Sequence, residues 1–149
     1  MTAAALLAAA LTLSPMPGWE IRDTELSFAD LSGRLEEAVT ANKMGVVSKA
    51  SASANVKAKL NEDIPGNLVL GVFRPDYAKR LLAINIQAGI EAPIRFYVTD
   101  DGDGTATLSW KTPSSVLAPY GANGELQALA RELDGVFAKI GADAIAAKP

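Results

Sequence analysis

The 149-residue sequence contains no cysteine and no histidine. This double absence excludes disulfides, zinc sites built from these residues, iron–sulfur clusters and haem ligation through either side chain. It also excludes nucleophilic sites in which histidine activates a serine or cysteine, as well as the ordinary histidine pH switch. An enzyme built from this chain would have to use carboxylates, lysine or tyrosine as acid–base groups. We expect no bound cofactor.

Basic residues are also in deficit, since 14 Lys and Arg stand against 17 Asp and Glu. The formal net charge is −3 and the pI is about 4.9, which argues against nucleic acid or an anionic membrane as a partner. Hydrophobic residues make up 49% of the chain and charged residues 21%, a balance that excludes a disordered or coiled-coil protein. A mass of 15.5 kDa suits one domain with its own core.

The N-terminal stretch carries no charge before Glu20, and Ala3–Leu13 is an Ala/Leu run broken only by one threonine. Such a run is too short to span a bilayer, which needs about 20 residues, but it matches the apolar region of a secretory signal peptide. Ala8–Ala10 offers a cleavage site, although the basic region is missing and a buried Ala/Leu helix is the alternative. We expect residues 1–18 to be a leader and residues 19–149 a single periplasmic or secreted domain with no membrane span after leader removal.

The remaining sequence alternates between strand and helix patterns. Strands are expected at Trp19–Leu26, Met44–Ser51, Leu68–Phe73, Ile94–Thr99 and Thr105–Lys111. Helices are expected after the capping residue Ser27, at Ala54–Leu60, at Pro75–Asn85, and through the C-terminal stripe Leu126, Leu129, Leu133, Val136, Phe137 and Ile140. This order predicts an α+β domain in which long helices cover one face of a mainly antiparallel sheet.

The clearest local signal is a β-hairpin, because two alternating segments flank the Asp/Gly-rich stretch 100–104. If Thr99 pairs with Thr105, the apolar residues sort onto the face that the helices cover. These are Ile94, Phe96, Val98, Ala106, Leu108 and Trp110. The other face then carries Arg95, Tyr97, Ser109 and Lys111.

The ordered set of segments resembles a bacterial family known as domain of unknown function 302. The resemblance covers roughly residues 19–142 and ends with the Asp/Gly hairpin and the C-terminal helix. The segments before these are Ser27-Phe28 with the amphipathic helix that follows, Met44–Val47, Ala54–Leu60, Leu70–Pro75, the helix Asp76–Ile84 and Ala92–Val98. The resemblance implies a fold similar to the TATA-binding-protein type and a tendency to dimerise, and it implies no established reaction. Many members have Cys directly after the proline that matches Pro93. Ile94 stands there in this chain, so a thiol-based role is not available to it.

Several clusters of charged residues resemble functional sites, but each is better explained as solvated surface. The carboxylates of the 100–104 stretch suit calcium in type, but an EF-hand loop starting at Asp101 would need Glu where Thr112 stands, so we interpret the stretch as a turn. The neighbouring pairs Glu36-Glu37 and Glu62-Asp63 point in different directions rather than across a site. The cations Lys57, Lys59, Lys79 and Arg80 are expected on the surface for solubility.

The most informative candidates are Phe73, Arg95, Tyr97 and Lys111, which we expect on the sheet face away from the helices. Such a face suits an acidic or aromatic small molecule. It also suits a homodimer interface, because Tyr, Phe and Arg are enriched at such interfaces, and this composition makes the dimer the favoured interpretation. The third interpretation is a half-exposed sheet whose amphipathic side chains reach solvent.

Together these observations predict an exported, non-catalytic domain that forms homodimers and binds a small ligand on or beside its sheet. The alternative is an enzyme that uses carboxylate, lysine or tyrosine side chains in the absence of histidine and cysteine. A nucleic-acid partner is not expected, since the chain is acidic.

Overall fold

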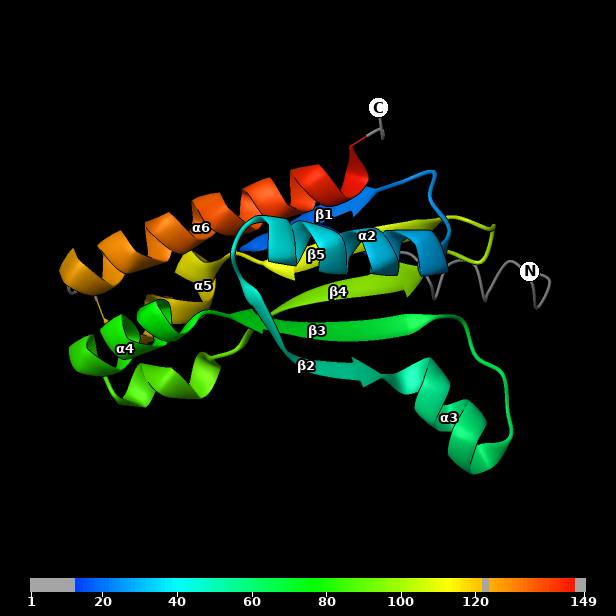
Figure 1. Cartoon of the computed structure of the whole chain (residues 1–149), viewed down its shortest axis with the longest axis horizontal. Helices are drawn as coiled ribbons and strands as arrows, with labels where there is room; N and C mark the ends of the chain where they lie inside the picture. Colours follow the sequence, from blue (N-terminus) through cyan, green and yellow to red (C-terminus); the bar gives the residue numbers. More distant parts are fainter. Residues whose placement is uncertain (1–12, 122–123, 147–149) are drawn as a thin grey trace.

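The computed structural model describes residues 13–121 and 124–146 and consists of one sheet and the helices around it (Figure 1). The sheet is antiparallel, with the strand order β1-β5-β4-β3-β2. Its strands are β1 (Trp19–Asp23), β2 (Gly45–Ser51), β3 (Asn67–Phe73), β4 (Ile94–Asp100) and β5 (Ala106–Lys111). The predicted α+β class is confirmed, and each strand lies within two residues of its expected start.

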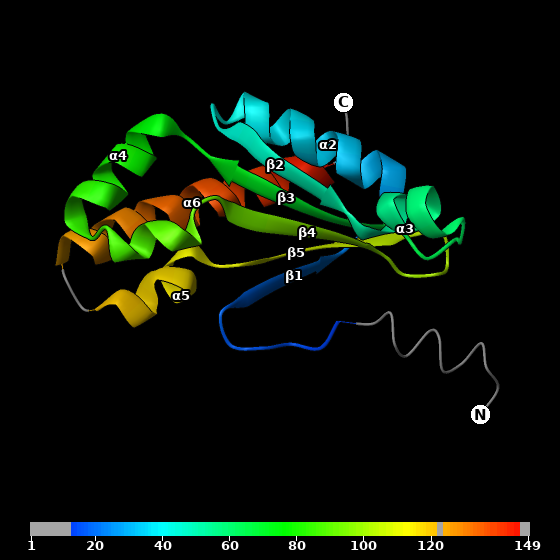
Figure 2. The ribbon, with the colours of Figure 1, turned by 90° about the horizontal axis from the view of Figure 1, so that it is seen from below.

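Two long helices, α2 (Phe28–Ala41) and α6 (Gly124–Ile145), pack side by side over one face of the sheet (Figure 2). The helix α2 begins where Ser27 Oγ accepts a hydrogen bond of 3.1 Å from the Asp30 amide, as the sequence predicts. Under the helices, the ring of Phe96 stacks on Phe137 with centroids 4.7 Å apart, and both side chains are fully buried. Burial of these apolar stripes is the main source of stability on this face.

Shorter helices lie at the two ends of the sheet (Figures 1 and 2). At one end are α4 (Pro75–Ile84), the 3₁₀ helix η1 (Gln87–Glu91), α5 (Pro113–Leu117) and the 3₁₀ helix η2 (Ala118–Tyr120); at the other end is α3 (Ala52–Leu60). From the sequence, Pro113 is expected only to end a strand. The structure shows that Pro113 also opens α5, whose first turn is capped by the Thr112 hydroxyl accepting from the Ser115 amide.

The β4–β5 hairpin forms as predicted, but its register is shifted by two residues. Thr99 pairs with Thr107 and not with Thr105. The turn therefore spans 101–105, where the Asp100 and Asp103 carboxylates accept hydrogen bonds from the amides of Gly102 and Thr105. Because side chains alternate with a period of two, this shift leaves every residue on its predicted face.

None of the helices within 13–121 and 124–146 is both long and apolar enough to cross a membrane. The Ala/Leu run interpreted as the core of a leader lies mostly in residues 1–12, outside the residues that the structure describes.

Candidate functional site

The sheet face opposite α2 and α6, called the open face below, carries rows of side chains that run across the strands. One row consists of Trp19, Lys111, Arg95, Gly71 and Ser48, and the next of Ile21, Ser109, Tyr97, Val69 and Ala50. Within the first row, Lys111 pairs with Trp19 and Arg95 with Gly71. The last pair of β4 and β5 is Phe96 with Trp110, and Arg95 and Lys111 are the next residue on each strand. Three of the four predicted site residues therefore lie in two adjacent rows.

Some residues of these rows line a hollow of about 660 Å³, which we call the open-face hollow. Its lining includes Trp19, Val69, Arg95, Tyr97 and Lys111. Its walls come from segments far apart in the sequence: Met16 and Pro17 before β1, Glu91 of η1, Val116 of α5 and Pro119 of η2. The volume lies within the roughly 300–1,000 Å³ that is usual for small-molecule sites. Sequence reasoning missed the walls, because nothing local in the sequence connects them to the sheet.

The polar groups of the hollow are mainly hydrogen-bond donors. Asn67 Nδ2 donates to the Tyr97 hydroxyl over 2.6 Å, which leaves the proton of that hydroxyl available for another acceptor. Neither Arg95 nor Lys111 forms an ion pair or a hydrogen bond through its side chain with the described part of the chain. The Lys111 ammonium lies 5.6 Å from the centre of the Trp19 ring.

The hollow also contains one carboxylate, that of Glu91. Its Oε1 accepts a hydrogen bond of 2.6 Å from the Tyr120 hydroxyl, and this bond raises the pKa of Tyr120 above its ordinary value. Glu91 is thus already engaged with a donor from outside the lining. The lining contains two cations, Arg95 and Lys111, and one carboxylate, so its net formal charge is +1, although the chain as a whole is acidic.

The segment before β1 is part of the folded domain. The Gly18 carbonyl accepts hydrogen bonds from the Thr112 amide at 2.8 Å and from the Ser115 hydroxyl at 3.3 Å. Gly18 has a φ of +80°, and a Cβ there would lie 2.6 Å from Ser115 Cβ, so only glycine permits this approach. These bonds hold Met16 and Pro17 at the edge of the hollow.

Phe73, the fourth predicted site residue, does not line the hollow. Its side chain is only 6% exposed and belongs to the hydrophobic core, together with Tyr77 and Leu81 of α4. Phe73 is the last residue of β3, next to the turn into α4, so strand alternation alone does not determine what covers it.

The acidic hairpin turn is a turn in the structure as well. Gly102 and Gly104 have φ values of +84° and +91°, which suit glycine. Asp101 accepts hydrogen bonds of 2.9 Å from the Thr107 hydroxyl, and burial raises the pKa of this carboxyl. No group of acidic side chains within the described residues is arranged to hold a metal ion.

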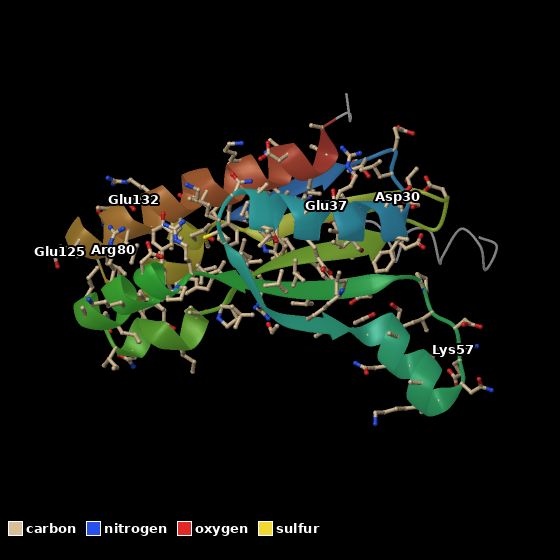
Figure 3. All side chains as sticks on the ribbon, in the orientation of Figure 1. Asp30, Glu37, Lys57, Arg80, Glu125 and Glu132 are labelled. Atoms are coloured by element: carbon tan, nitrogen blue, oxygen red, sulfur yellow. The ribbon has the colours of Figure 1, made fainter. Side chains whose placement is uncertain are left out.

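The remaining charged candidates lie on the surface, away from the hollow, and several form ion pairs (Figure 3). Arg80 of α4 forms a bidentate ion pair with Glu132 of α6, with its two terminal nitrogens 2.7 and 3.1 Å from the carboxylate oxygens. Lys57 of α3 pairs with Asp63. These contacts agree with the interpretation of these residues as solvated surface charges.

Comparison with known proteins supports the resemblance found in the sequence. The sequence model of the domain of unknown function DUF302 matches residues 20–142. No curated protein matches the chain. Among solved structures, the chain is similar to an uncharacterized conserved protein DUF302 from Bacillus stearothermophilus, with 20% identity and a TM-score of 0.76 over 86% of this chain and 98% of that one. The fold is therefore shared with that protein, and the match over most of its length shows that this chain belongs to the DUF302 family.

Proposed function

We propose that this domain is a non-catalytic module that binds a small organic molecule in the open-face hollow. The observation that carries the proposal is the hollow itself: about 660 Å³ on a sheet face that the long helices leave uncovered. Apolar surface from Trp19 and Val69 lies beside the polar groups of Arg95, Tyr97 and Lys111. Binding sites for small molecules typically combine an apolar lining with a few placed polar groups in this way.

The carboxylates support a binding role over the enzymatic alternative. Acid–base catalysis by carboxylates needs two such groups facing each other with their pKa values pushed apart. Within the described residues, no Asp or Glu side chain is fully buried, and Glu91 is the carboxylate in the lining of the hollow. Asp101, whose pKa is raised, lies at the hairpin turn and bonds to threonine hydroxyls.

We further propose that the domain is exported and that the leader is cleaved after Ala10 rather than directly before Trp19. The support is that Gly18 is bonded to Thr112 and that Met16 contributes to the hollow, so removal of residues 1–18 would open one wall of the site. The intact mass of protein purified from a secreting host measures the cleavage point. A mass that begins at Trp19, or an unprocessed chain, would contradict the proposal.

Homodimerisation remains part of the proposal, through the edge of the sheet rather than through the hollow. The edge strand β2 is exposed along its length except at its last residue, and α3 has no buried side chain. Val47 is 61% exposed and Leu60 62% exposed, so this edge presents apolar surface. We expect native mass spectrometry to show a dimer that Val47→Lys converts to a monomer. A wild-type monomer at micromolar concentration would contradict the dimer.

The proposed binding function is tested with a neutral fluorescent probe, N-phenyl-1-naphthylamine. We expect saturable binding to the wild-type domain and at least a tenfold loss of affinity in Val69→Trp, because the larger ring occupies the hollow. Ile86→Trp is the matched control: it adds the same ring at a position that is 78% exposed and outside the lining, and it should bind the probe as the wild type does. The proposal is wrong if the wild type shows no saturable binding, or if both variants bind equally well.

A further inference from the structure

Two like charges lie in the lining of the open-face hollow. Arg95 and Lys111 lie directly beyond the last paired residues of β4 and β5, Phe96 and Trp110, where side chains on neighbouring strands come within about 5 Å at their Cβ atoms. Like charges at opposite positions destabilise a sheet. No carboxylate of the described residues forms an ion pair with either of them. The folded protein therefore keeps an uncompensated pair of positive charges at this point.

The other two cations on the strands each have an ion-pair partner. Arg22 on β1 forms an ion pair of 2.7 Å with Glu20, and Lys49 on β2 forms an ion pair with Glu36 of α2. By their pairing with Leu108 and Leu70, these two residues lie on the face that the helices cover. Among the four cations on the strands, the two without an ion pair are thus the two that line the open-face hollow.

From this contrast we infer that the ligand of the hollow is an organic anion with an apolar or aromatic body. This inference rests on the proposed binding function. The anionic group lies between Arg95 and Lys111, where it relieves their repulsion and gains charge-assisted hydrogen bonds. The Tyr97 hydroxyl supplies a third donor, because its own acceptor position is filled by Asn67.

The apolar body of the ligand lies along Trp19 and Val69, which flank the cationic row within the same lining. Carboxylates, sulfonates and phosphate monoesters of aromatic or branched molecules share this chemistry. Glu91 opposes the anion weakly, since its carboxylate is already hydrogen-bonded to Tyr120. This carboxylate is therefore a useful control position, at which removal of charge should strengthen binding.

The test compares two fluorescent probes that differ in one sulfonate group: 8-anilinonaphthalene-1-sulfonate, an anion, and neutral N-phenyl-1-naphthylamine. The wild type should bind the anionic probe at least tenfold more tightly at low salt. The double variant Arg95→Gln/Lys111→Gln should lose this preference and still bind the neutral probe within about twofold of the wild type. Glu91→Gln should increase the preference, and Val69→Trp should weaken the binding of both probes to the hollow at least tenfold.

Salt provides a second reading on the unmodified protein, in case the double variant folds poorly. Raising the ionic strength from about 0.01 to 1 M shortens the screening length from roughly 30 to 3 Å, so the preference for the anion should fall while neutral binding stays. Equal affinity for both probes in the wild type, or a preference that survives the double substitution, would overturn the anion inference alone. Absence of binding by both probes would overturn the proposed function together with it.

Discussion

The close packing of α6 on the sheet leads to a prediction at Gly141. A Cβ built at this glycine would lie 2.6 Å from Trp110 Cη2 and 2.9 Å from Cζ3, closer than side-chain carbons approach one another. Trp110 is 3% exposed, and its ring lies 5.4 Å from that of Phe96, so it has little room to move. Gly135 lies in the same helix and would meet nothing within 4 Å. A comparison of alanine substitutions at Gly135 and Gly141 therefore separates the effect of helix propensity from the effect of packing against Trp110.

The two substitutions to alanine should change the free energy of unfolding by different amounts. Alanine is favoured over glycine in a helix by about 0.8–1 kcal/mol, so Gly135→Ala should stabilise the domain by roughly that amount. At Gly141 the same gain is opposed by overpacking against Trp110, which typically costs about 1–3 kcal/mol. Because the propensity term is common to both variants, the difference between them measures the packing cost directly.

Urea unfolding followed by circular dichroism gives both values, and thermal melts should show shifts of about 3 °C for each kcal/mol. We expect Gly135→Ala to be more stable than the wild type and Gly141→Ala to be less stable than Gly135→Ala by about 1–3 kcal/mol. Equal stabilisation by both variants would contradict this prediction, since it would mean that Trp110 does not pack against α6 at this position.

Three further predictions concern single side chains. Arg95→Gln should stabilise the ligand-free domain in urea unfolding by about 0.2–1 kcal/mol at low salt, because it removes repulsion from Lys111; a stability loss at low salt would contradict this. Ser27→Ala should lower the free energy of unfolding by about 1 kcal/mol through loss of the α2 cap, whereas Ser27→Asp should preserve it. Arg80 holds the pKa of the Glu132 carboxyl below its ordinary value, so this pair stabilises the fold above the unfolded pKa and the contribution is lost as pH falls through the lowered folded pKa. Glu132→Gln should therefore be less stable than the wild type at pH 7 and equally stable at low pH; a difference that persists in acid would show that packing, not charge, is responsible.

Most of the secondary structure could be predicted because it depends on local patterns. Ser27 marks the start of α2, and the apolar stripe from Leu126 to Ile140 marks α6. The two faces of the hairpin were also predictable, since they follow from alternation alone. For the same reason Arg95, Tyr97 and Lys111 could be assigned to one face from the sequence.

Features that depend on contacts between distant segments could not be predicted in this way. A register shift of two residues keeps all faces unchanged, so alternation cannot detect it; the side-chain bonds of Asp100 and Asp103 in the turn determine it instead. The burial of Phe73 depends on its place beside α4. The walls of the hollow depend on Gly18, whose carbonyl attaches the N-terminal segment to α5.

The two faces of the sheet differ in how completely their polar groups are satisfied. On the covered face Arg22 and Lys49 have carboxylate partners. On the open face the hydroxyls of Thr99 and Ser109 are buried without a hydrogen-bond partner among the described residues, and the cations of the hollow have no ion pair. Glu91 lines the same hollow, but its carboxylate is hydrogen-bonded to Tyr120 and forms no ion pair with Arg95. Thr99 and Ser109 lie outside the lining of the hollow, and the hydroxyl of Ser32 on α2 is also buried without a partner among the described residues. The two unpaired cations of the lining are therefore the groups that point to a partner from outside the chain.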